Sequence, residues 1–119
     1  MSDAKQKLGQ IGEDLAVKLL TGKGFEIVER NYRYGHGEID IIAKDGDELV
    51  FVEVKTRHNL EYGEPEYAVT KKKQKQIKKI AELYLYEKEI ENVDCRIDVI
   101  AVLMEKGKDP VINHIVNAF

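Results

Sequence analysis

The chain has 119 residues, the size of one compact domain. Its 43% hydrophobic and 34% charged residues suit a folded globular protein rather than a disordered one, and no apolar run approaches the roughly 18 residues that span a membrane. The net charge of −3 weighs against a protein that coats nucleic acid without preference, because such binding needs clustered Lys and Arg.

The amino terminus and the single cysteine bear on location and redox chemistry. Residues 1–7 are polar and no apolar core segment follows, so no signal peptide is predicted and we expect a cytoplasmic protein. Cys95 is the only cysteine, which excludes an internal disulfide and a cysteine-based zinc site. Its apolar neighbours predict a buried, inert thiol.

The first predicted element is a helix over residues 7–23, capped by Gly24. Its apolar side chains form one broad arc, and Glu13 falls inside that arc. Two interpretations of Glu13 are open. It either favours the positive end of the helix dipole near the helix start, or it faces a sheet and supplies an acid to a metal site.

Three strands are predicted next. Residues 25–34 alternate and are rich in aromatic side chains, and residues 38–44 and 48–56 form an antiparallel hairpin around the turn signal Asp45-Gly46-Asp47. The strand over residues 48–56 is apolar on both faces. We therefore expect it in the centre of the sheet, covered on both sides.

The second half of the chain begins with a predicted loop over residues 58–69. Thr70 is a suitable N-cap for a helix that ends near Glu87. The predicted core stripe of this helix consists of Ile77, Ile80, Ala81 and Tyr84.

A strand over residues 96–104 and an extended segment over residues 111–116 complete the order αβββαββ. The predicted fold is α/β (α+β), with a mixed central sheet flanked by helices. Residues 1–119 form a single domain in this interpretation.

The predicted hairpin brings two carboxylates together. If the turn leaves Lys44 opposite Leu49, counting back places Asp40 directly opposite Glu53, with Cβ atoms about 4.5–5.5 Å apart. A shift of the pairing by two keeps both acids on one face, whereas a three-residue turn without a bulge would separate them. Lys55 shares the face of Glu53 because side chains alternate along a strand.

Two carboxylates beside a lysine are typical of metal-dependent phosphodiesterases. Asp and Glu oxygens are the ligands that Mg²⁺ and Mn²⁺ prefer, and a lysine can orient the attacking water. Asp40 and Glu53, with the backbone carbonyl of Val54, are the predicted metal ligands. Lys55 would position the water and Glu13 would be an auxiliary acid. The alternative is that Lys55 only forms a salt bridge with one acid at an exposed sheet edge.

Basic side chains are candidates for contacts with nucleic-acid phosphates. We assign this role to Arg33, Arg57, Lys72 and Lys73, the last two within a run of six lysines between residues 71 and 79. Such a run is usually a solvated helix face. Lys73 either points at the same cleft as the acids or belongs to a solvated helix start, and the second interpretation is favoured. The three histidines are scattered and show no metal-ligand spacing.

At Asp40, Glu53 and Lys55 the chain resembles the PD-(D/E)-x-K nuclease superfamily, with Ile39 in the position of the proline. Over nearly its whole length it is similar to the YraN family. The segments that carry this likeness are Gly12-Glu13-Asp14-Leu15-Ala16, Arg30-Asn31-Tyr32-Arg33, Gly37-Glu38-Ile39-Asp40-Ile41-Ile42-Ala43, Phe51-Val52-Glu53-Val54-Lys55-Thr56-Arg57 and Arg96-Ile97-Asp98-Val99. The resemblance implies a restriction-endonuclease-like fold, an endonuclease activity, and a relationship to archaeal Holliday-junction resolvases, whose helix-borne acid Glu13 would match.

The acid pair and the resemblance together predict a Mg²⁺- or Mn²⁺-dependent endonuclease that acts on DNA, including branched or structured DNA. Two alternatives stay open, namely a non-catalytic nucleic-acid-binding or scaffold module with this fold, and a ribonuclease, because nothing in the sequence reads the 2′-hydroxyl. A resolvase-like role implies a two-fold homodimer. The acidic net charge is unlike that of a resolvase and favours a partner protein that helps to hold the substrate.

Overall fold

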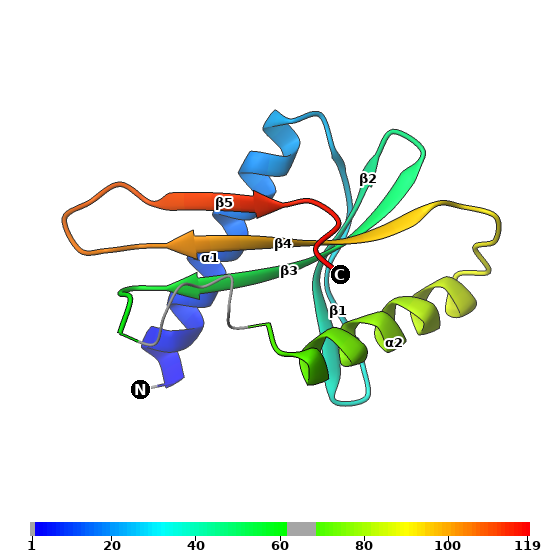
Figure 1. Ribbon diagram of the computed structural model, residues 1–119, viewed down its shortest axis with the longest axis horizontal. Coiled ribbons are helices and arrows are strands. Elements are labelled where there is room, and N and C mark those ends of the chain that lie inside the picture. Colours follow the sequence, from blue (N-terminus) through cyan, green and yellow to red (C-terminus); the bar gives the residue numbers. More distant parts are fainter. Residues whose placement is uncertain (1, 62–68) are drawn as a thin grey trace.

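The computed structural model describes residues 2–61 and 69–119 (Figure 1). The elements are α1 (Ser2–Gly22), β1 (Glu26–Tyr34), β2 (Gly37–Asp45), β3 (Glu48–Arg57), α2 (Lys71–Glu87), β4 (Cys95–Leu103) and β5 (Val111–Ile115). This is the predicted order αβββαββ. Most of the loop predicted over residues 58–69 lies outside the described residues.

The five strands form one sheet in the order β1-β2-β3-β4-β5. β3 and β4 are parallel, whereas the other neighbouring pairs are antiparallel. A parallel pair needs a long crossover, and α2 provides it between β3 and β4 (Figure 1). The mixed sheet with two helices is compatible with a restriction-endonuclease-like core, as predicted.

The two helices cover opposite faces of the sheet (Figure 1), and each face has its own apolar core. In β3, Phe51 packs on the α2 side and its neighbours Val50 and Val52 pack on the α1 side. All three are almost fully buried. The prediction that this strand is central and covered on both faces is confirmed, because the alternation of a strand sends successive apolar side chains into two cores.

The second helix begins and packs as predicted. The Lys73 backbone N–H donates to the Thr70 hydroxyl at 3.2 Å, so Thr70 is the N-cap. The buried side chains of α2 are Ile77, Ile80, Ala81 and Tyr84.

The first helix starts at Ser2 rather than near residue 7. Glu13 therefore lies in the middle of α1, where the dipole of the helix end has no influence. The interpretation of Glu13 as a helix-start residue is wrong.

The β2–β3 hairpin has the register that places the acids opposite each other. Lys44 pairs with Leu49, and the described pairing continues to Ile41 opposite Val52. The next position along β2 is Asp40, and the next along β3 is Glu53.

β2 bends sharply at Asp40. Ile39 packs in the α2 core whereas Ile41 packs in the α1 core, although residues two apart in a regular strand share a face. Asn31 lies opposite Asp40 on β1, between the pairs Arg30–Ile41 and Tyr32–Ile39, and has a left-handed φ of 55°. The bend separates this end of β2 from β3 and leaves Asp40 in the gap.

The predicted burial of Cys95 is wrong. The residue is exposed at the first position of β4, ahead of the buried stretch of that strand. The apolar neighbours that suggested burial follow it and point into the cores. Partial burial of the sulfur, with Asp94 and Glu48 nearby, raises the pKa of the thiol, so the thiol stays protonated at neutral pH.

The described helices include none that is both long enough and apolar enough to cross a membrane.

Candidate metal and catalytic site

Asp40 is the centre of the site. Its Oδ2 accepts a hydrogen bond from the Val54 backbone N–H at 2.8 Å, across the gap where β2 leaves β3. Burial raises the pKa of Asp40 to about 8, and the neighbouring Glu53 carboxylate adds to this effect, while the hydrogen bond from Val54 opposes it. A negative charge at Asp40 is therefore poorly compensated by the protein itself, and a cation would stabilise it.

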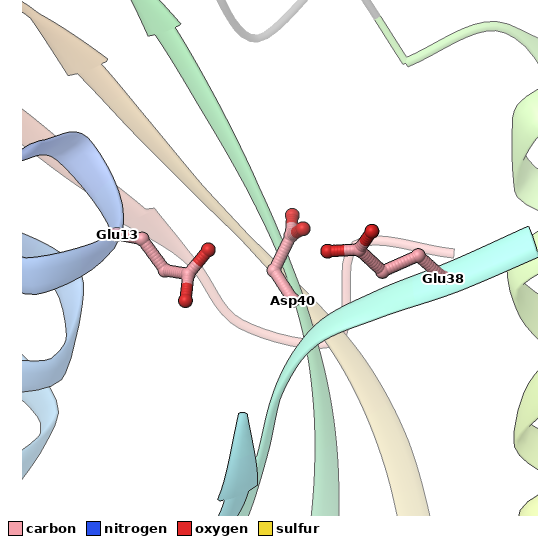
Figure 2. A group of neighbouring side chains, drawn as sticks. All are labelled: Glu13, Glu38 and Asp40. Carbon is pink, nitrogen blue, oxygen red and sulfur yellow. The ribbon is translucent and has the colours of Figure 1, made fainter. Parts of the chain in front are cut away.

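Two further carboxylates approach Asp40. Glu13 from α1 and Glu38 from β2 each offer an oxygen, and the oxygens of the three acids lie within 4.8 Å of one another. Figure 2 shows the Glu13 and Glu38 side chains pointing toward Asp40 from opposite sides. Three carboxylate oxygens at this spacing are a donor set that suits a hard divalent cation such as Mg²⁺ or Mn²⁺.

Glu13 is buried and held in place from β1. Arg30 donates to its Oε1 from Nε at 3.1 Å and from Nη2 at 3.0 Å, and Asn31 donates to the same oxygen from Nδ2 at 3.0 Å. Arg30 also donates to Asp14 Oδ1 at 2.7 Å, which anchors the guanidinium on α1. Because all three bonds to Glu13 end on Oε1, they fix the carboxylate while its second oxygen stays available. Glu13 thus faces the sheet, as the second interpretation required.

The close approach of α1 to the sheet depends on Gly12. A Cβ at this position would overlap the Thr56 hydroxyl oxygen on β3. The missing side chain lets the helix backbone lie directly on the strand. Glu13, the next residue, is carried to Asp40 by this contact.

Glu53 is buried beside Asp40 and is contacted by two lysines. Its Oε1 lies 3.7 Å from Lys55 Nζ and 3.9 Å from Lys73 Nζ. Burial raises the pKa of Glu53, and the charges of Lys73 and Lys55 oppose this increase. Glu53 is not one of the three acids within 4.8 Å of one another, so the site has a three-acid side and an acid–lysine side that meet at Asp40.

Two sequence interpretations are corrected here. The Lys55–Glu53 ion pair forms, but on the central strand β3 rather than at an exposed sheet edge. Lys73, for which a solvated helix start was favoured, is half-buried and points at Glu53, because the first turn of α2 crosses the sheet at this acid.

The three acids lie in a cleft of about 650 Å³, which is also lined by Gln6, Gly9, Gln10, Arg30, Asn31, Arg33 and Val54. Arg33 is exposed and its Nε lies 3.3 Å from Glu38 Oε2. Of the other predicted phosphate contacts, Lys72 is exposed on α2, and Arg57 lines a neighbouring hollow. The backbone N–H of Val54 supports Asp40, and its carbonyl as a metal ligand stays a prediction.

Glu38, Arg30 and Asn31 were not singled out from the sequence as site residues. Glu38 lies two residues before Asp40, so strand alternation could have indicated it. Asn31 could have been found only from the β1–β2 register. Arg30 carries no local signal, because its role depends on how α1 crosses β1.

Comparison with known proteins places the chain in a family. The family model described as "Uncharacterised protein family UPF0102" matches residues 12–102, the segment that holds all of these acids and both lysines. The UPF0102 protein of Geotalea daltonii is 52% identical over 112 residues, which cover 94% of this chain and 88% of that protein. Those of Dictyoglomus turgidum, 45% identical over 116 residues (96% of this chain, 98% of that protein), and Rhodococcus opacus, 48% over 112 residues (94% and 95%), are also similar. The chain therefore belongs to the UPF0102 family, which is the YraN family that its motifs resemble.

Proposed function

We propose that this protein is a Mg²⁺- or Mn²⁺-dependent endonuclease that hydrolyses phosphodiester bonds in DNA. The observation that supports it most is the setting of Asp40, a carboxylate with a raised pKa that lies within 4.8 Å of two other acids and beside a buried Glu53. Negative charges on neighbouring carboxylates repel one another, and a bound divalent cation relieves this repulsion. On the acid–lysine side of the site, Lys55 and Lys73 supply positive charges for the hydrolysis of a phosphodiester.

The metal ligands in this proposal are Asp40, Glu13 and Glu38, whose oxygens lie within 4.8 Å of one another. Glu53 and the Val54 carbonyl, the other ligands predicted from the sequence, stay predictions. A bound cation supplies electrostatic stabilisation of the negative charge that develops on a scissile phosphate. Lys55 is held by Glu53 with its ammonium at the site, where it can donate a hydrogen bond to the attacking water. Lys73 brings a second positive charge beside Glu53, where it would attract a phosphate group.

The test is a cleavage panel of labelled linear, single-stranded, flapped and four-way DNA, together with RNA, in Mn²⁺ or Mg²⁺. The parent should cut at least one DNA, while Asp40→Asn and Lys55→Ala should reduce the rate by about 100-fold or more, as for loss of a group that stabilises the transition state. Asp109→Asn and Lys18→Ala, at exposed positions, are charge-matched controls. Full activity in either site variant contradicts the assignment, and cleavage of RNA alone would indicate a ribonuclease.

A non-catalytic binding module is the second candidate. Glu53 already has two lysine partners, and Asp40 can keep a proton near neutral pH, so the acids can be satisfied without a metal. Thermal unfolding with millimolar Mn²⁺ separates the two candidates. Stabilisation that is lost in Asp40→Asn supports the nuclease, whereas no stabilisation together with no cleavage favours the binding module.

A further inference from the structure

Arg57 differs from the other arginines in its partners. Three of the four arginines are paired with carboxylates: Arg30 with Glu13 and Asp14, Arg33 with Glu38, and Arg96 with Asp45, Glu48 and Asp98. Within the part of the chain that the structure describes, Arg57 has no such ion pair, and its buried Nε has no hydrogen-bond partner. A buried donor without an acceptor lowers stability, and an anionic ligand bound by this guanidinium would account for its position.

Arg57 lines a hollow of about 740 Å³ between the end of β3 and the first turns of α1. One part of its wall is apolar and includes Ala4, Leu8 and Val54. Another part is basic, and none of the lining residues that the structure describes is acidic. The basic lining residues are Lys5, Lys55, Arg57 and His58. A ligand that fits both parts has an anionic group and an apolar body, as a nucleotide does.

The hollow adjoins the cleft of the three acids. Gly9 and Val54 line both of them. Lys55 lines the hollow while its ammonium contacts Glu53. A nucleic-acid strand whose scissile phosphate lies at the acids would therefore pass over Gly9 and place its next nucleotide in the hollow.

We propose that this hollow binds the nucleotide next to the scissile phosphate of an unpaired DNA strand. The inference rests on the proposed function and specifies its substrate class. Arg57 pairs with the phosphate of that nucleotide, and the apolar wall covers its sugar and base. A base that enters such a hollow has left its stack, so single strands and flaps fit the site, whereas an intact duplex would first have to open.

Calorimetric titration tests the hollow without cleavage. The probes are thymidine 5′-monophosphate, thymidine and inorganic phosphate, and the parent should bind the monophosphate most tightly. Arg57→Gln should weaken binding of the monophosphate and of phosphate about tenfold or more, because a charge-assisted hydrogen bond is lost. Leu8→Ala should weaken binding of the monophosphate but not binding of phosphate. This variant tests the hollow even if Arg57→Gln does not fold. Lys18→Gln, an exposed position on α1, is the charge-matched control.

Cleavage kinetics separate this inference from the proposed function. With Mn²⁺, Arg57→Gln should raise KM for single-stranded DNA about tenfold, with a smaller change in kcat. If the parent cuts DNA and Arg57→Gln cuts and binds the monophosphate equally well, the inference fails and the proposed function stands. If the parent cuts no DNA, the proposed function fails, and the titrations by themselves support or overturn nucleotide binding in the hollow.

Discussion

Asp98 and Asp40 are carboxylates on strands of the same sheet, but their surroundings shift their pKa values in opposite directions. Asp98 is fully buried, accepts hydrogen bonds from Arg96 at 3.0 and 3.2 Å and from the Asn117 backbone N–H at 2.9 Å, and contacts His114 Nε2 at 2.7 Å. Burial alone would raise the pKa of Asp98, but these hydrogen bonds outweigh it and lower the pKa. Asp40 accepts one backbone hydrogen bond, lies among other acids, and has a pKa raised to about 8.

The difference is the one expected between a structural carboxylate and a functional one. The partners of Asp98 come from β4, β5 and the segment after β5, and Arg96 extends the network to Glu48 at 2.6 Å and Asp45 at 3.1 Å, at the turn of the β2–β3 hairpin. These groups satisfy the charge of Asp98 within the protein. Asp40 lacks such compensation, which is the pattern expected where a ligand completes the site.

Substitution of Asp98 should have the largest effect on stability, and it tests whether Asp98 and Asp40 differ in their structural role. Asp98→Ala removes two hydrogen bonds of Arg96 and leaves the Asn117 backbone N–H and His114 Nε2 without their partner, so it should lower the free energy of unfolding by about 3–5 kcal/mol. Asp40→Ala removes a carboxyl group that is mostly protonated at pH 7 and has one backbone hydrogen bond, so it should cost less, about 1 kcal/mol. Urea unfolding at pH 7 measures both variants. Equal losses would mean that Asp40 is as structural as Asp98.

Gly12→Ala tests whether the setting of Asp40 depends on the close approach of α1. The new Cβ would overlap Thr56, and such overpacking should lower the free energy of unfolding by about 1–3 kcal/mol and weaken Mn²⁺ binding by displacing Glu13. Gly22→Ala is the matched control on the same helix, because no atom lies within 4 Å of a Cβ built there. It should change stability by less than about 1 kcal/mol and leave Mn²⁺ binding unchanged. Titration calorimetry measures the metal affinity, and normal Mn²⁺ binding by Gly12→Ala would contradict this role of the helix.

The pH dependence of metal binding sharpens the contrast further. Asp40 keeps its proton below about pH 8, and a cation binds the ionised form, so Mn²⁺ affinity should fall as the pH decreases below 8. If one proton is released, the loss approaches about tenfold per pH unit, equivalent to about 1.4 kcal/mol. Calorimetry between pH 6 and 9 measures it. An affinity that does not change with pH would show that Asp40 is not the titrating ligand.

The smallest effect concerns the metal-free protein. The folded-state pKa of Asp40 lies above that of the unfolded chain, so between about pH 4 and 8 the folded state binds more protons and stability falls as the pH rises. Asp40→Asn cannot ionise at this position, so it should be more stable than the parent at pH 8.5, by at least about 1 kcal/mol. At pH 5 the advantage of the variant should be smaller. Urea unfolding at both pH values checks the sign, and a variant that is less stable at pH 8.5 would contradict it.

Local patterns in the sequence determined the elements and the hairpin. The turn at Asp45-Gly46-Asp47 set the register of Lys44 opposite Leu49, and this register alone put Asp40 and Glu53 at facing positions. Thr70 and the spacing of Ile77 and its partners likewise predicted α2. These features can be predicted from the sequence because turn residues and the side-chain periods of strands (2 residues) and helices (3.6 residues) depend on residues close together in the chain.

Only the tertiary structure decided which side chains complete the site. Glu13 reaches Asp40 because α1 lies closely on β3 at Gly12, and Lys73 reaches Glu53 because the first turn of α2 crosses the other face of the sheet. The bend of β2 at Asp40, opposite the left-handed Asn31, brings both faces of the sheet to one carboxylate. Such contacts depend on how helices pack across a twisted sheet and join residues far apart in the chain, so no local pattern carries them.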